Sequence, residues 1–320
     1  MADAEAMIVF LLWHTAERRQ MKKKLEELNL LDDFLFGTLI SHPVYGERFA
    51  KTLVATLLDR DVKILKIVPQ MNFYGQDTDR HGARLDVYIE EDSEGGDGAL
   101  SVGSIFDIEP DRTEHTKEKK FLPRRVRFYR STIDTRNLQS GSDYSQLKNV
   151  IIIMLLPYDP FGYNRIIYTV KNKCLEEPEM AYDDGVLNLF LFTGGKVGTV
   201  PQPLKELLRY IENTTWQNAV NDSLKEIQTM VDKVKHEETA IVVYMRGLIR
   251  DQLIKNEGRQ EGLQEGLKEC LFSILSDLGS IPENVLAQIN DEDDTDILNQ
   301  WIKLAARSDS MEEFTQKISS

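Results

Sequence analysis

The chain has 320 residues, of which 41% are hydrophobic and 29% are charged, as in an ordinary soluble globular protein with one sizeable α/β core or two domains. Its two cysteines, Cys174 and Cys270, lie far apart and outside any metal-binding spacing, so the sequence argues against a disulfide framework and a structural zinc site. The net charge of −14 argues against nucleic-acid binding over the whole surface.

Membrane insertion and secretion find no support in the sequence. No segment reaches the ~18 consecutive apolar residues that a membrane helix needs. The apolar run at 8–13 is short, and no basic segment precedes it as in a signal peptide. We therefore expect a cytoplasmic protein without membrane contact. The helical and strand patterns begin near Met21, so residues 1–24 are interpreted as an N-terminal extension, for which an upstream start codon would account.

The first part of the chain reads as two helices followed by three strands. Apolar residues at helical spacing predict helices over 25–36 and 45–58. Residues 62–68 are rich in β-branched side chains and predict a strand. Residues 84–90 and 104–109 alternate between apolar and polar, which is typical of half-buried strands.

A helical crossover is predicted to follow this hairpin. Pro110 ends the third strand because it has no N–H to donate to the ladder. A helix is predicted from Pro123 to about Asn137, and the apolar run 150–156 predicts a central strand that is covered on both faces. One more strand is predicted at 165–170. The order α-β-β-β-α-β predicts a compact mixed sheet.

The chain beyond Pro203 is predicted to be helical, at 204–211, 221–236 and 239–255. A Glu-Gly pair then recurs every four residues from Glu257 to Gly266. Glycines at this spacing could let two helices approach closely, but we interpret the repeat as a loosely helical linker, because each glycine costs a helix about 1 kcal/mol. The domain prediction is therefore a core at 25–172, a strand and helical extension at 173–255, and the linker with a small helical tail at 256–320.

Acidic residues on the predicted hairpin are candidate metal ligands. Asp86 lies in the middle of one strand and Glu109 near the end of its partner. Because side chains alternate along a strand, Asp107, Glu109 and Asp111 should share one face, and Ile108 should face the other way. Carboxylates on adjacent strands supply the oxygen ligands that Mg²⁺ or Mn²⁺ prefers. Such an ion can orient water and offset charge on a phosphodiester, although single acids on strands are more often ordinary surface residues.

A basic segment follows the second acid directly. It has nine basic residues against three acidic ones between positions 112 and 136, within an otherwise acidic chain. The basic residues are Arg112, Lys117, Lys119, Lys120, Arg124, Arg125, Arg127, Arg130 and Arg136. A solvated charged face would explain the segment by itself. Its position beside the acids favours contact with a phosphate backbone.

Five sequence motifs occur in order along the chain. They are R-L-D-V-Y at 84–88, F-D-I-E at 106–109, L-P-R-R-V-R-F-Y-R-S-T-I-D at 122–134, S-G-S-D-Y-S-Q-L at 140–147 and P-Y-D-P-F-G at 157–162. Together they resemble the PD-(D/E)XK family of transposases and recombination-promoting nucleases, over residues 28–240. The resemblance implies a restriction-endonuclease-like α/β core with a helical C-terminal extension, and a magnesium-dependent DNA endonuclease.

The resemblance also implies roles for individual residues. Asp86 and Glu109 correspond to metal ligands, together with the backbone carbonyl of Ile108, and Glu47 on the first helix is a weaker candidate acid. Arg125 and Tyr129 match an arginine and a tyrosine of the helix after the second acid, although Tyr129 is as well explained by packing. The residues expected to hold DNA phosphates are Lys120, Arg124, Arg125 and Arg127.

One position departs from the family pattern. The family has lysine or glutamine two residues after Glu109, where this chain has Asp111. An aspartate cannot polarise water as an ammonium does or donate as an amide does, although it could add a metal ligand. Arg112 or Lys120 could supply the missing positive charge.

This departure leaves two alternatives to a nuclease open. The first is a degraded nuclease fold that binds DNA or protein without chemistry. The second is an interaction protein whose helical tail drives formation of a homo-oligomer while the core acts as a scaffold.

Overall fold

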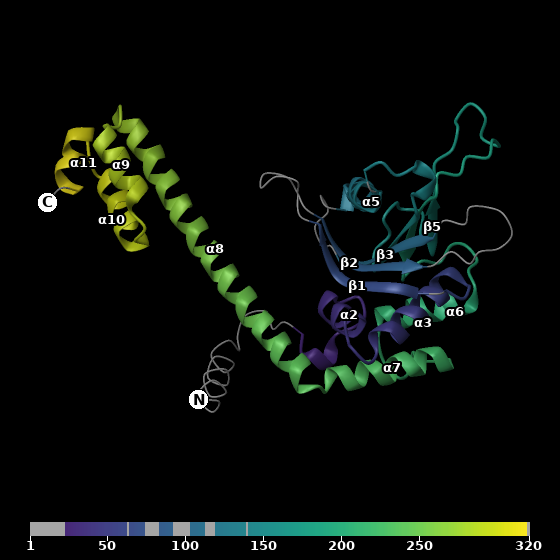
Figure 1. Cartoon of the computed structure of the whole chain (residues 1–320). Helices are drawn as coiled ribbons and strands as arrows, with labels where there is room; N and C mark the ends of the chain where they lie inside the picture. The colour runs from purple at the N-terminus through teal and green to yellow at the C-terminus, as the bar shows by residue number, and fades with distance from the viewer. Residues whose placement is uncertain are drawn as a thin grey trace. The chain divides into compact units, whose positions relative to one another are not determined.

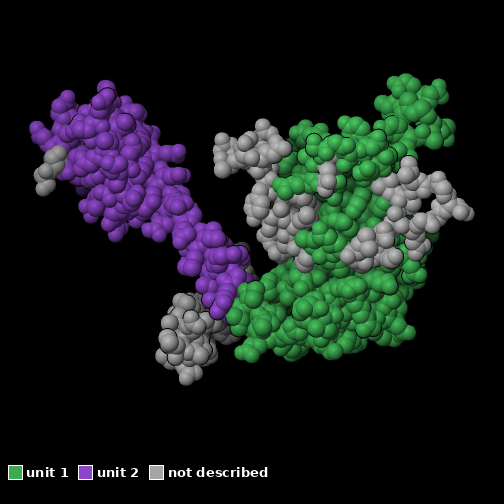
Figure 2. All heavy atoms as spheres, viewed as in Figure 1, with its two compact units in different colours: residues 1–244 green, residues 245–320 purple. Residues whose placement is uncertain are grey.

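The computed structural model describes residues 23–62, 64–73, 83–91, 103–112, 119–138 and 140–318, with the backbone alone for 64, 65, 69–73 and 83–87. The chain forms two compact units, residues 1–244 and residues 245–320 (Figure 2). Two expectations lie outside the described residues: the N-terminal extension before residue 23 and the basic residue Lys117.

A mixed six-stranded sheet is the centre of the first unit (Figure 1). Its strands are β1 (Ile64–Phe73), β2 (Ala83–Glu91), β3 (Ser104–Pro110), β4 (Asn149–Leu156), β5 (Ile167–Val170) and β6 (Val186–Phe192). The spatial order is β1-β2-β3-β4-β6-β5. The first three strands pair antiparallel, β4 lies parallel to both β3 and β6, and β5 lies antiparallel to β6. The predicted mixed α/β sheet is confirmed.

Helices cover both faces of this sheet. The helix α5 (Leu122–Asn137) connects β3 to β4 and covers one face, whereas α2 (Asp33–Ile40), α3 (Gly46–Leu58), α6 (Gln202–Glu212) and α7 (Asp222–Lys235) lie on the other (Figure 1). Pro123 stands in the first turn of α5, where its missing N–H costs nothing. The predicted crossover helix is confirmed.

Strand β4 shows why the sheet needs both layers of helices. All of its residues after Asn149 are buried. Ile151, Ile153 and Leu155 pack toward α2 and α3, and the alternate residues Ile152 and Met154 pack toward α5. Each such side chain contributes roughly 1.5–3 kcal/mol when it is fully buried.

Two segments of the first unit differ from the predicted elements. The predicted helix at 25–36 is a single 3-10 turn, Leu25–Glu27, followed by α2. The break occurs because the carboxylate of Asp32 accepts a hydrogen bond from the N–H of Asn29 (2.7 Å), a local bond that competes with helix formation. In addition, β6 inserts between β4 and β5, so the sheet extends beyond residue 172.

The second unit is helical. It consists of most of α8 (Glu238–Leu278), with α9 (Glu283–Asp291), α10 (Thr295–Ala305) and α11 (Met311–Ile318) packed on the end of α8 around Leu271, Leu275 and Phe314. The Glu-Gly repeat was predicted to be helical, and α8 is continuous through it. The residues between the glycines, such as Gln260, Leu263 and Gln264, favour a helix and offset the cost. Among the described helices, none has a stretch long and apolar enough to cross a bilayer.

Candidate active site

Three acidic residues lie at every second position from Asp107 in β3 to Asp111 just after it, on the face that α5 covers. Asp107 is completely buried, Glu109 is 5% exposed and Asp111 is 8% exposed. Ile108 packs in the core of the opposite face, so the predicted alternation of side chains is confirmed. The N–H of Asp111 donates to the carbonyl of Leu155 (2.9 Å), which extends the pairing with β4 past Pro110. Buried carboxylates are costly, so this set is not an ordinary solvent-facing surface.

The strand register brings position 86 next to Glu109. Val87 lies opposite Ile108, and Tyr88 lies opposite Asp107, so Asp86 and Glu109 occupy neighbouring positions on adjacent strands. Opposite positions of an antiparallel pair face the same side of a sheet. The side chain of Asp86 lies outside the described residues. Its strand position agrees with the predicted two-acid site.

Asp111 forms a partly buried ion pair with a residue of α5. Nη2 of Arg125 lies 2.6 Å from Oδ2 of Asp111, and the hydroxyl of Tyr158 donates to the same oxygen (2.9 Å). Helix α5 holds Arg125 there because Leu122 and Val126, on either side of it in sequence, are buried against the sheet. The carboxylate of Asp111 is therefore already bound to a cation.

Arg125 carries a permanent positive charge in this site. Burial alone would lower the pKa of its guanidinium, but the negative charge of Asp111 and smaller effects of Tyr129 and Glu109 raise that pKa above its ordinary value. The sequence predicted that Arg125 contacts DNA, and that Arg112 or Lys120 supplies the positive charge that Asp111 lacks. The positive charge beside Glu109 comes instead from a residue fourteen positions after Asp111.

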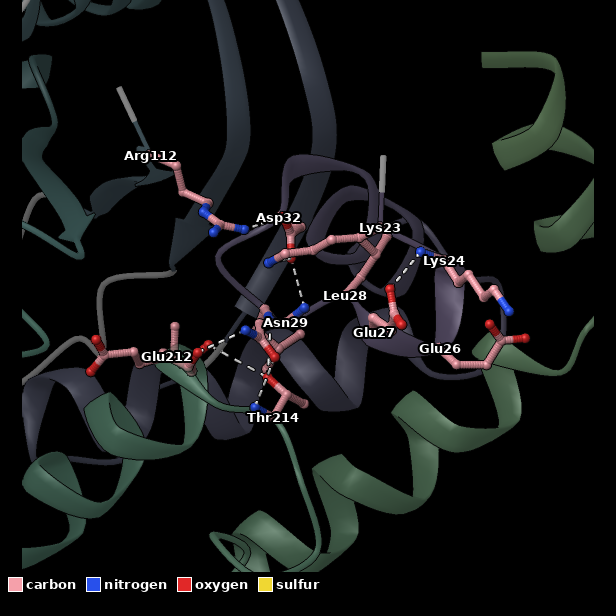
Figure 3. Close-up of polar contacts among 12 residues, drawn as sticks. Lys23, Lys24, Glu26, Glu27, Leu28, Asn29, Asp32, Arg112, Glu212 and Thr214 are labelled. Atoms are coloured by element: carbon pink, nitrogen blue, oxygen red, sulfur yellow. Dashed lines mark hydrogen bonds and ion pairs between the residues drawn. The ribbon is translucent and has the colours of Figure 1, made fainter. Parts of the chain in front are cut away.

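Arg112 is committed to a different partner. Its guanidinium pairs with the carboxylate of Asp32 at the start of α2 (Figure 3). A shallow cleft of about 290 Å³ lies here, lined by Leu31, Asp32, Asp33, Pro110, Asp111 and Arg112. The Arg112–Asp32 ion pair therefore forms part of the wall of this cleft.

The remaining candidates divide between surface and core. Lys120, Arg124 and Arg127 are exposed on or beside α5 and are accessible to a large ligand. Tyr129 packs against the core below α5, which agrees with the packing interpretation. Glu47 is exposed in the first turn of α3, in the layer on the other face of the sheet, so the structure does not group it with the acids of β3.

Two aromatic residues of the site escaped sequence reasoning. Tyr158 binds Asp111 and also lies below the ammonium of Lys119, whose Nζ is 4.3 Å from the ring centroid. Tyr88 is buried on the same sheet face, and burial together with the nearby Glu90 carboxylate raises the pKa of its hydroxyl well above the ordinary value. The P-Y-D-P-F-G motif contains Tyr158, but the resemblance that this motif supports gives the residue no role.

The donor chemistry fits a divalent cation with two carboxylates, from Asp86 and Glu109. Asp111 is a poor third ligand, because Arg125 and Tyr158 already bind one of its oxygens. The Ile108 carbonyl lies in a strand that is paired on both sides, so it offers at most its second lone pair. Within the described residues no cluster of three His, Cys, Asp or Glu side chains forms a metal site, and the Asp86 side chain is not among them.

Comparison with known proteins gives no match: no protein-family model, no curated protein and no solved structure is similar to this chain at a significant level.

Proposed function

We propose that this protein is a metal-dependent endonuclease that hydrolyses DNA phosphodiester bonds with a restriction-endonuclease-like core. The observation that carries the proposal is the buried Glu109 beside position 86, on the sheet face under α5. A divalent cation offsets the cost of burying a carboxylate such as that of Glu109. The sequence resemblance adds a biological role, namely DNA breakage that promotes recombination or the movement of mobile elements.

The chain's own residues have distinct parts in this proposal. Asp86 and Glu109 hold Mg²⁺ or Mn²⁺, and the bound ion supplies Lewis-acid stabilisation of the phosphodiester and activation of water. Arg125 keeps a fixed positive charge next to Glu109 and restrains the Asp111 carboxylate. The exposed residues that hold the DNA backbone are Lys120, Arg124 and Arg127.

Nicking of supercoiled plasmid tests the proposal. The intact protein should nick or linearise the plasmid with Mg²⁺ or Mn²⁺. Asp86→Asn and Glu109→Gln should each lose at least about 100-fold of the rate, because either change removes a charged ligand. Glu177→Gln, which alters an exposed carboxylate, is the matched control and should retain full activity. Equal activity in all four proteins would show that the cleavage comes from a contaminant or from another site.

A second candidate function is a nuclease fold that binds DNA without cleaving it. The Asp111–Arg125 pair favours this alternative, because a carboxylate stands where the resembled family has lysine or glutamine, and a partly exposed arginine is paired with it. Calorimetric titration with Mn²⁺ separates the two functions. Metal binding that Glu109→Gln abolishes, with no cleavage by the unmodified protein, would support the binding module and refute the nuclease.

A further inference from the structure

An apolar stripe runs along α8 in the second unit. Its members recur at intervals of three and four residues, which keeps them on one side of a helix with 3.6 residues per turn. They are Met245, Ile249, Leu253, Asn256, Gln260, Leu263, Leu267 and Leu271, with the two polar residues at the centre. Leu271 is buried under the C-terminal helices, whereas Leu253 and Leu263 are 55% and 54% exposed. In the described part of the chain, no residue covers the middle of the stripe.

The members of the stripe are spaced symmetrically along the chain on either side of Gly258. Asn256 and Gln260 lie two residues from this position, and Leu253 and Leu263 lie five residues from it. Ile249 and Leu267 lie nine residues away, and Met245 and Leu271 thirteen. A surface with this symmetry is complementary to itself when two copies lie antiparallel across a two-fold axis, as in an isologous interface. Leu253 then meets Leu263, Ile249 meets Leu267, and Asn256 meets Gln260.

Charges along α8 select the antiparallel direction. Residues 245–255 contain three basic residues and one acidic residue, whereas residues 257–269 contain four acidic and two basic ones. A parallel pair would place like halves together. In the antiparallel pair, the mainly basic half of each helix lies beside the mainly acidic half of the other.

One mirrored pair has like charges but faces away from the stripe. Asp251 and Glu265 both lie seven residues from Gly258. At 100° per residue they stand about 160° round the helix from the middle of the stripe. They therefore do not oppose each other across the seam.

The middle of α8 also needs such a partner for its own stability. Every residue from Arg250 to Leu263 is exposed, and an added Cβ at Gly258 or Gly262 would have no neighbour within 4 Å. Short helical stretches that contain glycine and lack tertiary packing are unfavourable in water. Burying the stripe supplies the missing packing.

We propose that α8 pairs antiparallel with α8 of a second copy of this chain, centred on Gly258, and that the seam is formed by Ile249, Leu253, Leu263 and Leu267. This pairing makes the protein a two-fold symmetric dimer. It does not depend on the nuclease proposal, because none of these residues belongs to the sheet unit.

Sedimentation equilibrium of the full chain tests the dimer with a matched pair of variants. Leu253→Lys places a charge in the seam twice per dimer and should raise the dissociation constant at least about 100-fold. Ile254→Lys introduces the same charge at an equally exposed position that faces away from the stripe, and should change the constant less than about threefold. An unmodified protein that is monomeric at about 50 µM, or equal effects of the two variants, would refute the proposal.

Cysteine cross-linking tests the direction of the pairing. In a chain with Cys174→Ser and Cys270→Ser, a mixture of Asn256→Cys and Gln260→Cys proteins should form the mixed disulfide, because these positions face each other. Either variant alone should cross-link at least about fivefold more slowly, since equivalent cysteines are four residues, or about 6 Å, out of register. Faster cross-linking of each variant with itself would indicate a parallel pair and overturn the antiparallel assignment.

Discussion

Removal of the Arg125 guanidinium is the most direct perturbation of the candidate site. Asp111 keeps only 9% of its side chain exposed, and Arg125 keeps 33%. Removing one member of a buried ion pair typically costs 3–5 kcal/mol, because the other charge stays buried without compensation. Since Arg125 is partly exposed, we expect Arg125→Met to lower the free energy of unfolding by about 3 kcal/mol, at the lower end of that range. The matched control Arg127→Met, on the exposed side of α5, should change it by less than about 0.5 kcal/mol.

A double-mutant cycle identifies the origin of this loss. Asp111→Asn removes the stranded charge and keeps an acceptor for the Tyr158 hydroxyl, so Arg125→Met with Asp111→Asn should be more stable than Arg125→Met alone.

The assay must report on the sheet unit by itself, because the two units can unfold separately. Native-state hydrogen exchange of the β4 amides does so, since that strand is buried in the first unit. A loss below about 1 kcal/mol in Arg125→Met would refute the buried-pair reasoning. So would a double variant that is no more stable than the single one.

Two further predictions concern the surface of α5 and the edge of the site. The double variant Arg124→Ala with Arg127→Ala should weaken DNA binding, and the slope of log K against log salt concentration should fall by about 1 for each lost phosphate contact. Fluorescence anisotropy measures this slope, and Arg209→Ala, an exposed position in the opposite helical layer, is the control. An unchanged slope would show that DNA binds elsewhere. Burial alone would raise the pKa of Glu90, but hydrogen bonds from Lys148 and Tyr88 and the nearby lysine charges lower it overall. Glu90→Gln should therefore cost stability at pH 7, and the difference from the unmodified protein should shrink as the pH falls below about 4, because protonation removes the native advantage. A difference independent of pH in urea unfolding would contradict this assignment.

Local patterns predicted the sheet unit well because neighbouring residues determine them. The alternation around Ile108, the apolar run of β4 and the proline at the start of α5 each reflect an environment repeated over several residues. The position of β6 was not predictable in the same way. It depends on which strand edge remains free after β4 has formed, and that is a property of the whole sheet rather than of residues 186–192.

The candidate site was predictable only in part, for a related reason. Strand register follows from the hairpin, so Asp86 and Glu109 could be placed on adjacent strands from their spacing. The partner of Asp111 could not, because Arg125 reaches it from a helix, and several arginines of α5 have the same local sequence character. Which of them faces the sheet depends on the rotation of α5, and burial of Leu122 and Val126 fixes that rotation.

The Asp111–Arg125 pair limits the chemistry open to a nuclease on this fold. A lysine or glutamine at position 111 could contact the attacking water directly, whereas Asp111 has one oxygen bound by Arg125 and Tyr158. Arginine can offset the negative charge that develops on a phosphodiester, but it stays protonated at neutral pH and cannot accept the proton of water. If the protein cleaves DNA, the proton must therefore leave to solvent or to the substrate. Replacement of Arg125 would then lower the rate through lost charge stabilisation, without removing a step in the pH–rate profile.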